Sequence, residues 1–117
     1  MPRRPPAPPR AALGEFEKLV LLAVLRLGED AYGATVIAEL ERRTGRAAAP
    51  GAVYVALRRM EQKGMLSSRL GDPTPERGGR AKRFLRVEPG GLAALREARA
   101  EWEAMSDGLE GLLEPGR

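Results

Sequence analysis

Apolar side chains recur every three or four residues near the start of the chain, which is the spacing of one buried face of a helix. The first such pattern covers residues 15–27 and stops at Gly28. A second covers about residues 32–44, and Gly45 is its stop signal. In this second helix the predicted inward residues are Val36, Ile37 and Leu40, and the predicted outward residues are Glu39, Glu41, Arg42 and Arg43.

The middle of the chain predicts a third helix followed by a hairpin. Pro50 suits the first turn of a helix, where its missing N–H has no cost, and the pattern ends near Gly64. Two β-prone runs then follow, at about residues 65–70 and 81–88, joined by a loop rich in proline and glycine. In the second run, Leu85 and Val87 are predicted to face the core, and the opposite side carries Lys82, Phe84 and Arg86.

The C-terminal region predicts one long helix from Pro89 to about Leu113. Its apolar stripe consists of Leu92, Leu95, Ala98, Trp102, Met105, Leu109 and Leu112. This stripe is too long for one small core to cover, so we expect a partner helix against it. Gly108 and Gly111 each cost about 1 kcal/mol of helix stability relative to alanine, so the last turn is expected to fray.

The order of these elements predicts a fold class. Three helices followed by a strand, a loop and a second strand make a winged helix-turn-helix, a mainly α fold with a small β-hairpin. We predict a disordered basic arm over residues 1–12, the winged helix-turn-helix over 13–88, a dimerisation helix over 89–113 and a short tail over 114–117. The 117 residues suit one compact domain.

Positive charge is concentrated in one part of the chain. Residues 58–88 hold nine basic and four acidic side chains, whereas residues 89–117 hold three basic and six acidic ones. A local basic excess of this kind is the electrostatic footprint of a protein that binds nucleic acid. The third helix and the hairpin loop are therefore the candidate contact regions.

The third helix has one face suited to a DNA groove. Val53, Leu57 and Met60 form its predicted buried side. The opposite side carries Gly51, Ala52, Val55, Arg58, Arg59 and Gln62, and Tyr54 lies on the flank. Small residues allow close approach, arginine and glutamine read base edges, and the tyrosine hydroxyl is within reach of a phosphate. The alternative is an ordinary solvated surface in which Arg58 and Arg59 pair with Glu61 or Glu39.

The hairpin loop is the predicted wing. Its basic residues are Arg77, Arg80, Lys82 and Arg83, and Gly78 and Gly79 leave the loop free to adapt to a partner. Such a loop contacts the DNA backbone and positions more than it specifies. A charged loop kept for solubility is the alternative. A minor-groove role for Arg3, Arg4 and Arg10 is weighed against a solvated tail, and the tail is preferred.

Three segments of the sequence resemble the PadR family of bacterial transcriptional regulators: LGEFEKLVLLAVLRLGEDAYG, PGAVYVALRRMEQKGML and GGRAKRFLRVEPGG. The resemblance covers about residues 13–105 and implies a dimeric winged-helix repressor, in which Tyr54 matches the tyrosine of the recognition helix. Ala49 stands where these proteins often have serine, so the third helix loses a side-chain N-cap. The C-terminal helix resembles that of the short members, which dimerise through it.

The resemblance assigns the apolar stripe to a homodimer. The predicted interface residues are Leu92, Leu95, Trp102, Met105, Leu109 and Leu112. Trp102 has two interpretations, simple packing or the wall of an apolar cavity that binds a flat aromatic effector, and packing is preferred.

Composition excludes most enzymes. The chain has no cysteine and no histidine, so it lacks a thiolate nucleophile, an imidazole base and an ordinary zinc site, and no cofactor is expected. Its longest apolar run, residues 19–25, is too short to span a membrane, so a cytoplasmic location is expected. The prediction is a sequence-specific DNA-binding repressor without enzymatic activity. The competing hypothesis is a winged-helix protein-interaction module that binds no DNA.

Overall fold

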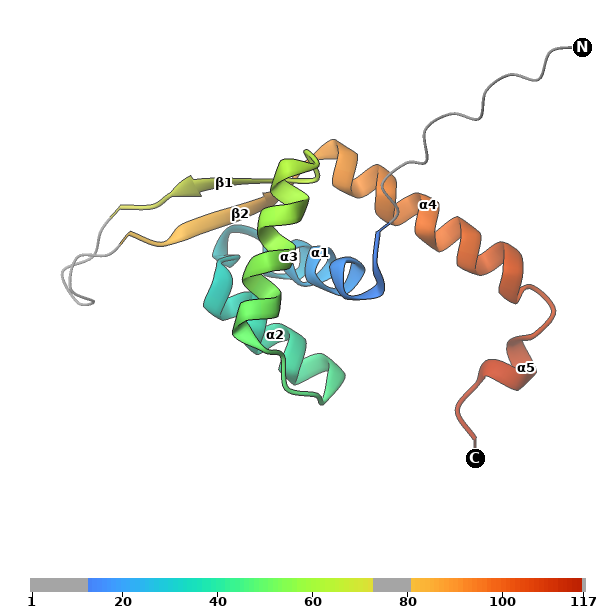
Figure 1. Cartoon of the computed structure of the whole chain (residues 1–117). Coiled ribbons are helices and arrows are strands. Elements are labelled where there is room, and N and C mark those ends of the chain that lie inside the picture. Colours follow the sequence, from blue (N-terminus) through green and yellow to red (C-terminus); the bar gives the residue numbers. More distant parts are fainter. Residues whose placement is uncertain (1–12, 73–80, 117) are drawn as a thin grey trace, which may run out of the picture.

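The computed structural model describes residues 13–72 and 81–116. Its elements are α1 (Glu15–Leu27), the 3₁₀ turn η1 (Gly28–Asp30), α2 (Gly33–Thr44), α3 (Pro50–Gln62), β1 (Leu66–Leu70), β2 (Arg83–Val87), α4 (Pro89–Ser106) and α5 (Glu110–Leu113). Figure 1 shows α1, α2 and α3 packed together, with the hairpin extending to one side and α4 to the other. The predicted mainly helical fold with one small hairpin is confirmed.

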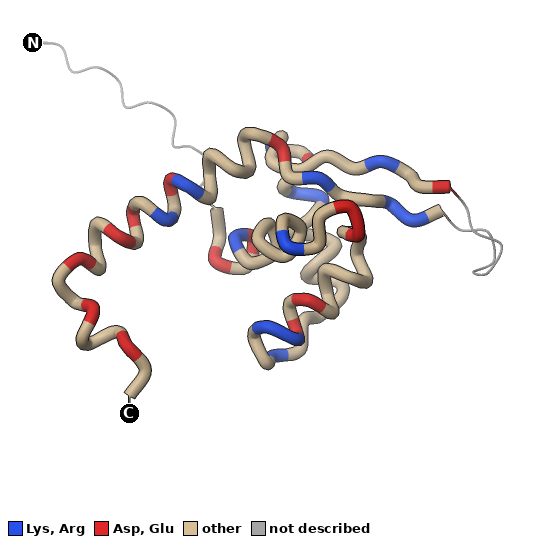
Figure 2. Tube along the Cα trace, turned by 180° about the vertical axis from the view of Figure 1, so that it is seen from behind, with Lys and Arg blue, Asp and Glu red and all other residues tan. Residues whose placement is uncertain are grey.

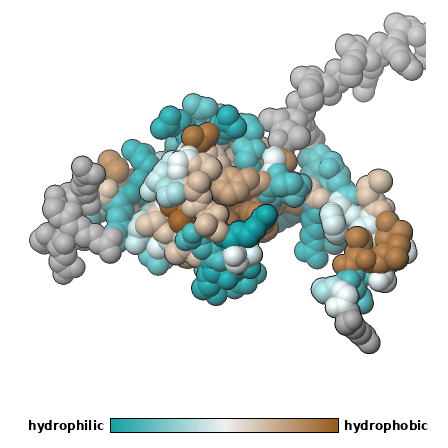
Figure 3. Space-filling view, turned by 60° about the horizontal axis from the view of Figure 1, so that its bottom comes forward, coloured by the Kyte–Doolittle hydropathy of each residue, from teal (hydrophilic) through white to brown (hydrophobic). Residues whose placement is uncertain are grey.

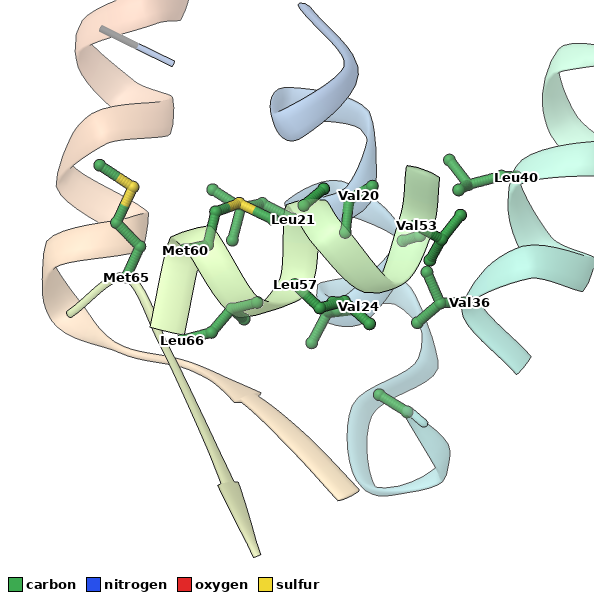
Figure 4. Close-up of a cluster of buried hydrophobic side chains, with 13 residues drawn as sticks. Val20, Leu21, Val24, Val36, Leu40, Val53, Leu57, Met60, Met65 and Leu66 are labelled. Carbon is green, nitrogen blue, oxygen red and sulfur yellow. The ribbon is translucent and has the colours of Figure 1, made fainter. Parts of the chain in front are cut away.

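The core is formed where α1, α2, α3 and the start of β1 meet (Figure 4). Its fully buried large side chains are Val20, Leu21, Val24, Val36, Val53, Met60 and Leu66. Val20, Val24, Val36, Val53 and Met60 lie on the helix faces that the spacing predicted, whereas the burial of Leu21 was not predicted and Leu66 belongs to a strand. Full burial of an aliphatic side chain contributes about 1.5–3 kcal/mol, so these residues supply much of the stability of the three-helix unit.

The helix ends follow from proline and glycine. Gly28 and Gly45 cap α1 and α2 with positive φ values of 57° and 71°, a conformation that glycine adopts without a steric penalty. Pro50 occupies the first turn of α3, as predicted. Ala49 is the N-cap of this helix and gives it no side-chain hydrogen bond, also as predicted.

The predicted outward orientation of Glu39 is wrong. This side chain is only 10% exposed, and it accepts hydrogen bonds from Arg42 Nη2 at 2.8 Å and Arg43 Nε at 2.7 Å. Glu39 follows Val36 by three residues, so helical geometry places it on the buried face of α2 despite its charge. Hydrogen bonds from Arg42 and then Arg43 lower the pKa of the Glu39 carboxyl below its usual range.

The hairpin is an antiparallel pair in which Leu66 lies opposite Val87 and Leu70 opposite Arg83. Its strands are slightly shorter than predicted. β2 is also tied to the helices, because the Leu85 N–H donates to the Ala31 carbonyl at 2.8 Å. Leu85 and Val87 pack against the core, as predicted.

The predicted single helix over residues 89–113 is wrong. α4 ends at Ser106, and the chain then turns at Gly108, which has a φ of +86°, before the short α5 begins. A positive φ cannot continue a right-handed helix, so Gly108 separates the two helices rather than merely weakening one long helix, whereas Gly111 lies within α5. No helix in the described part of the chain is long and apolar enough to span a membrane.

The start of α4 is held closely against the hairpin. At Gly91 an added Cβ would lie 2.5 Å from the Met65 carbonyl oxygen, so only glycine allows this approach. Ala94 and Leu95 then pack against the core, and the rest of α4 runs away from it (Figure 1). The second half of the helix therefore has little contact with its own domain.

Candidate DNA-binding surface

The outer face of α3 is open to solvent. Val53, Ala56, Leu57 and Met60 are buried. The predicted contact residues Gly51, Ala52, Tyr54, Val55, Arg58, Arg59 and Gln62 are all exposed. The division of the helix into a buried and an exposed side is therefore the predicted one.

Arg58 and Arg59 have no ion-pair or hydrogen-bond partner among residues 13–72 and 81–116. The partners proposed for a solvated surface are occupied, because Glu39 is held by Arg42 and Arg43, and Glu61 accepts a hydrogen bond from the Ser68 hydroxyl. The ion pairs of that alternative are not present in this part of the chain. Both guanidinium groups are available to an anionic partner.

Tyr54 leans from α3 across the start of α2. Its side chain is 52% exposed, so the predicted half-buried position is found. A Cβ added at Gly33 would lie 2.6 Å from the Tyr54 hydroxyl oxygen and ring carbon Cε1. The ring therefore occupies the space that any larger residue at position 33 would need, and this glycine sets where the hydroxyl lies.

A cleft of about 630 Å³ separates α3 from β2. Its lining includes Arg58 of α3, Arg83 of β2 and the adjoining Lys82, together with Tyr32 and Tyr54. Three cations, two tyrosine rings and one carboxylate, that of Glu61, thus gather between the third helix and the hairpin. Polar tyrosine edges and positive charge suit a phosphate backbone running through this cleft.

Two of the predicted wing cations already have partners within the protein. Lys82 Nζ lies 4.5 Å from the centroid of the Tyr32 ring and 3.4 Å from its hydroxyl oxygen. Arg83 Nη1 donates to the Ser68 hydroxyl at 3.0 Å, which links it to Glu61. The sequence pattern gave no indication of these links, because they join residues up to 50 positions apart. Arg77 and Arg80, like Arg3, Arg4 and Arg10, lie outside the described residues.

An apolar groove of about 500 Å³ runs between α1 and α4. It is lined by Leu19, Leu22 and Leu25 on one side and by Leu92, Leu95 and Trp102 on the other. Leu92 and Leu95 are half-buried, whereas Trp102 is 65% and Met105 81% exposed. Leu109 and Leu112 are also exposed, and Figure 3 shows apolar side chains gathered at the α5 end of the molecule.

Charged side chains are unevenly distributed along α4 and α5. The middle of α4 carries Arg96 and Arg99 with Glu97 between them, and acidic residues dominate from there to Glu114 (Figure 2). These acidic residues are Glu101, Glu103, Asp107, Glu110 and Glu114.

The family model of the PadR-like transcriptional regulators matches residues 21–97, from the middle of α1 to the middle of α4. This chain belongs to the PadR-like family. The match includes α3 and the cleft that carry the candidate DNA contacts. PadR-like regulators are DNA-binding proteins and not enzymes, so the predicted class of protein is confirmed.

Solved PadR structures have the same fold. The chain is 31% identical to a PadR family transcriptional regulator from Eggerthella lenta DSM 2243, with 87% of this chain and 88% of that one covered at a TM-score of 0.64. A PadR family regulator from Clostridium difficile R20291 is 22% identical over 86% of this chain and 100% of that one, with a TM-score of 0.66.

A protein described as a winged-helix DNA-binding protein also has this fold. F93 from STIV, a winged-helix DNA-binding protein, is 13% identical over 78% of this chain and 90% of that one, with a TM-score of 0.60. No curated protein sequence matches the chain significantly.

Proposed function

We propose that this PadR-like regulator represses transcription by binding an inverted-repeat operator as a homodimer. The observation that carries the proposal is the exposed face of α3, on which Arg58 and Arg59 have no partner in the described part of the chain. A helix of this kind enters a major groove about 12 Å wide, where arginine donates to guanine O6 and N7. Tyr54 and the wing then contact the phosphates on either side.

The homodimer is supported by the exposed apolar residues of α4 and α5. Trp102, Met105 and Leu112 are too exposed to stabilise the monomer, and the groove between α1 and α4 continues their surface. A two-fold axis through this surface relates two α3 helices. Two such helices read half-sites in successive major grooves when they are roughly 34 Å apart, which requires an inverted repeat.

The same groove supports release by an effector. Trp102 forms one end of an apolar lining, on which a flat aromatic compound would stack. A compound that binds one spacing of the two α3 helices better than another shifts operator affinity. Saturable quenching of Trp102 emission, with release of operator DNA, supports this step, and a broad aromatic panel without quenching contradicts it.

The central experiment is a binding titration with the region upstream of the protein's own gene. We expect a specific complex with two protomers per site. Arg58→Ala or Arg59→Ala should lose about 1–3 kcal/mol of discrimination between operator and random DNA. Arg26→Ala is the matched control, because it removes an exposed arginine from α1 and not from α3.

Two outcomes would contradict the proposal. Equal loss on operator and random DNA would show that the arginines contact only phosphate. The absence of any duplex binding at low salt would favour the protein-interaction module instead.

A further inference from the structure

Four side chains form a continuous stack where the wing, residues 66–87, leaves the helices. The guanidinium Cζ of Arg69 lies 5.2 Å from the centroid of the Phe84 ring. That ring meets the Tyr32 ring edge-to-face, with centroids 5.6 Å apart and an interplanar angle of 74°. Lys82 Nζ lies over the Tyr32 ring, 4.5 Å from its centroid. We call these four residues the wing-base stack.

We propose that the wing-base stack fixes the direction of the wing relative to α3, so that Tyr32 and Phe84 are positioning residues for DNA binding. Neither residue belongs to α3, the helix that is proposed to enter the groove. The inference rests on the proposed DNA-binding function. It adds that the wing-base stack determines how many DNA phosphates the wing contacts.

The helix side of the stack is a fixed support. Tyr32 is the N-cap of α2, and its N–H donates to Thr35 Oγ1 at 2.9 Å. The residue before it, Ala31, is fully buried and accepts the backbone hydrogen bond from Leu85. The backbone that carries the Tyr32 ring is therefore held by both α2 and β2.

The wing side of the stack is equally confined. A Cβ added at Gly71 would lie 2.5 Å from Phe84 Cε2, so the glycine backbone packs directly on that ring. The N–H of Gly71 donates to the Lys82 carbonyl at 2.7 Å, beyond the last paired residues of the strands. Lys82 thus lies at the outer end of the described hairpin, where a small tilt of the strands produces the largest displacement.

The stack works with a second link on the other face of the hairpin. Arg83 and Ser68 project from the face opposite Phe84, and they connect through Ser68 to Glu61 of α3. One link holds the hairpin to the start of α2 and the other to the end of α3. Contacts on both faces oppose tilt in either direction, whereas the Glu61 link alone would leave one direction free.

Aromatic and cation–π contacts suit this task because they are directional. Edge-to-face rings and a cation over a ring face each have a preferred geometry, and they need no buried ion pair. The stack also places the charges of Lys82 and Arg69 at set positions, and Lys82 lines the cleft. Loss of a ring removes the geometry without removing a charge.

The first test uses neutral substitutions and the salt dependence of operator binding. Tyr32→Leu and Phe84→Leu should weaken operator binding about tenfold, in line with the loss of a ring pair and a cation–π contact. They should also reduce the slope of log affinity against log salt by about one unit, because a displaced wing loses phosphate contacts. Tyr32→Phe, which keeps the ring, should behave as the wild type.

A purely structural role for the rings gives a different result. If Tyr32→Leu only destabilised the fold, the fraction of active protein would fall and the salt slope would not change. Gly71→Ala is a further variant. Its added methyl group displaces the Phe84 ring and leaves the Tyr32 and Phe84 side chains themselves unchanged. An unchanged slope in Tyr32→Leu, Phe84→Leu and Gly71→Ala, each shown to be folded by circular dichroism, overturns the proposal.

The second test needs no DNA, so it separates this inference from the proposed function. The chain has no cysteine, which allows Gln62→Cys on α3 and Asp72→Cys on the wing to carry a pair of spin labels. The labelled chain is diluted with unlabelled protein so that only distances within one chain are measured. The distance between the two labels should have one narrow distribution, and Tyr32→Leu should broaden or shift it. An unchanged distribution refutes the stack as a positioning device, whereas failure of the wild type to bind any duplex refutes only the DNA-binding function.

Discussion

The winged helix-turn-helix and the C-terminal helices treat their apolar side chains in opposite ways. From α1 to β2 most of the large aliphatic residues are buried or half-buried in one core, and Leu21 and Met60 have no exposed surface. In α4 only Gly91 is buried, and Leu112 of α5 is 83% exposed. The first region has what it needs to fold within one chain, whereas the second exposes a surface suited to a partner.

The same contrast appears in the tolerance for added atoms. Gly33 and Gly71 of the first region each have a neighbour so close that an added Cβ would overlap it. An added Cβ at Gly111 of α5 meets nothing within 4 Å. Close packing in the first region fixes the candidate DNA contacts, and open packing in the second leaves room for another copy of the chain.

The largest expected effect comes from placing charge on the exposed apolar surface. Met105→Glu combined with Leu112→Glu should convert the proposed homodimer to a folded monomer and reduce operator affinity about 100-fold, because the two half-sites would no longer be bound together. Sedimentation measures the oligomeric state, and circular dichroism measures the fold of the monomer.

The matched control adds the same charges to the opposite side of α4. Ala100→Glu with Ala104→Glu changes two exposed positions away from the apolar stripe, so this variant should remain dimeric. A Met105→Glu, Leu112→Glu variant that stays dimeric would show that the interface lies elsewhere. One that unfolds completely would show that the first region is not self-sufficient.

A smaller effect is expected from alanine at the two contrasting glycines. Gly33→Ala should cost about 1–3 kcal/mol of stability by overpacking against Tyr54, or the ring should move and operator binding should weaken. Gly111→Ala should be neutral or slightly stabilising, because alanine favours helix and meets no neighbour. Thermal unfolding and operator titration measure both variants.

A double substitution tests the assigned cause. If the Tyr54 ring is what Gly33→Ala collides with, adding Tyr54→Leu should remove most of the stability cost of the alanine. If Gly33→Ala cost the same stability with and without the Tyr54 ring, the strain would come from another contact.

The smallest expected effect concerns Glu39 and acid. Because Arg42 and Arg43 lower its folded-state pKa, the ionised carboxyl stabilises the fold at pH values above its unfolded pKa, near 4.5. That contribution is lost as the pH falls through the lower, folded-state value. Glu39→Gln should therefore be less stable than the wild type at pH 7, and the difference should shrink below about pH 4. A difference in unfolding free energy that stays constant from pH 7 to pH 3 would contradict it.

The sequence predicted those features that depend on local spacing. The buried and exposed sides of α3 and the inward direction of Leu85 follow from periods of 3.6 and 2, which a short stretch of sequence contains. Glu39 was misplaced because residue type was given more weight than its spacing from Val36. The turn at Gly108 was underestimated, since a cost per glycine does not reveal that the backbone adopts a positive φ.

The wing-base stack could not be predicted, for a different reason. It joins Tyr32 to Lys82 and Phe84, and these residues meet only after α1, α2 and the hairpin have packed together. No local pattern records such a meeting. The sequence indicated which residues carry charge at the wing, and the three-dimensional structure shows which of those charges already have partners.

The free edge of β1 has a consequence for solubility. β1 pairs with β2 on one side and with no other strand in the described part of the chain, so its outer backbone groups are open to a strand from another molecule. Edges of this kind promote aggregation unless they are short, charged or interrupted. β1 has five residues and carries Arg69 near its end. A second β1 placed alongside in antiparallel register would bring few hydrogen bonds and two like charges, so this edge is protected against growth into an extended sheet.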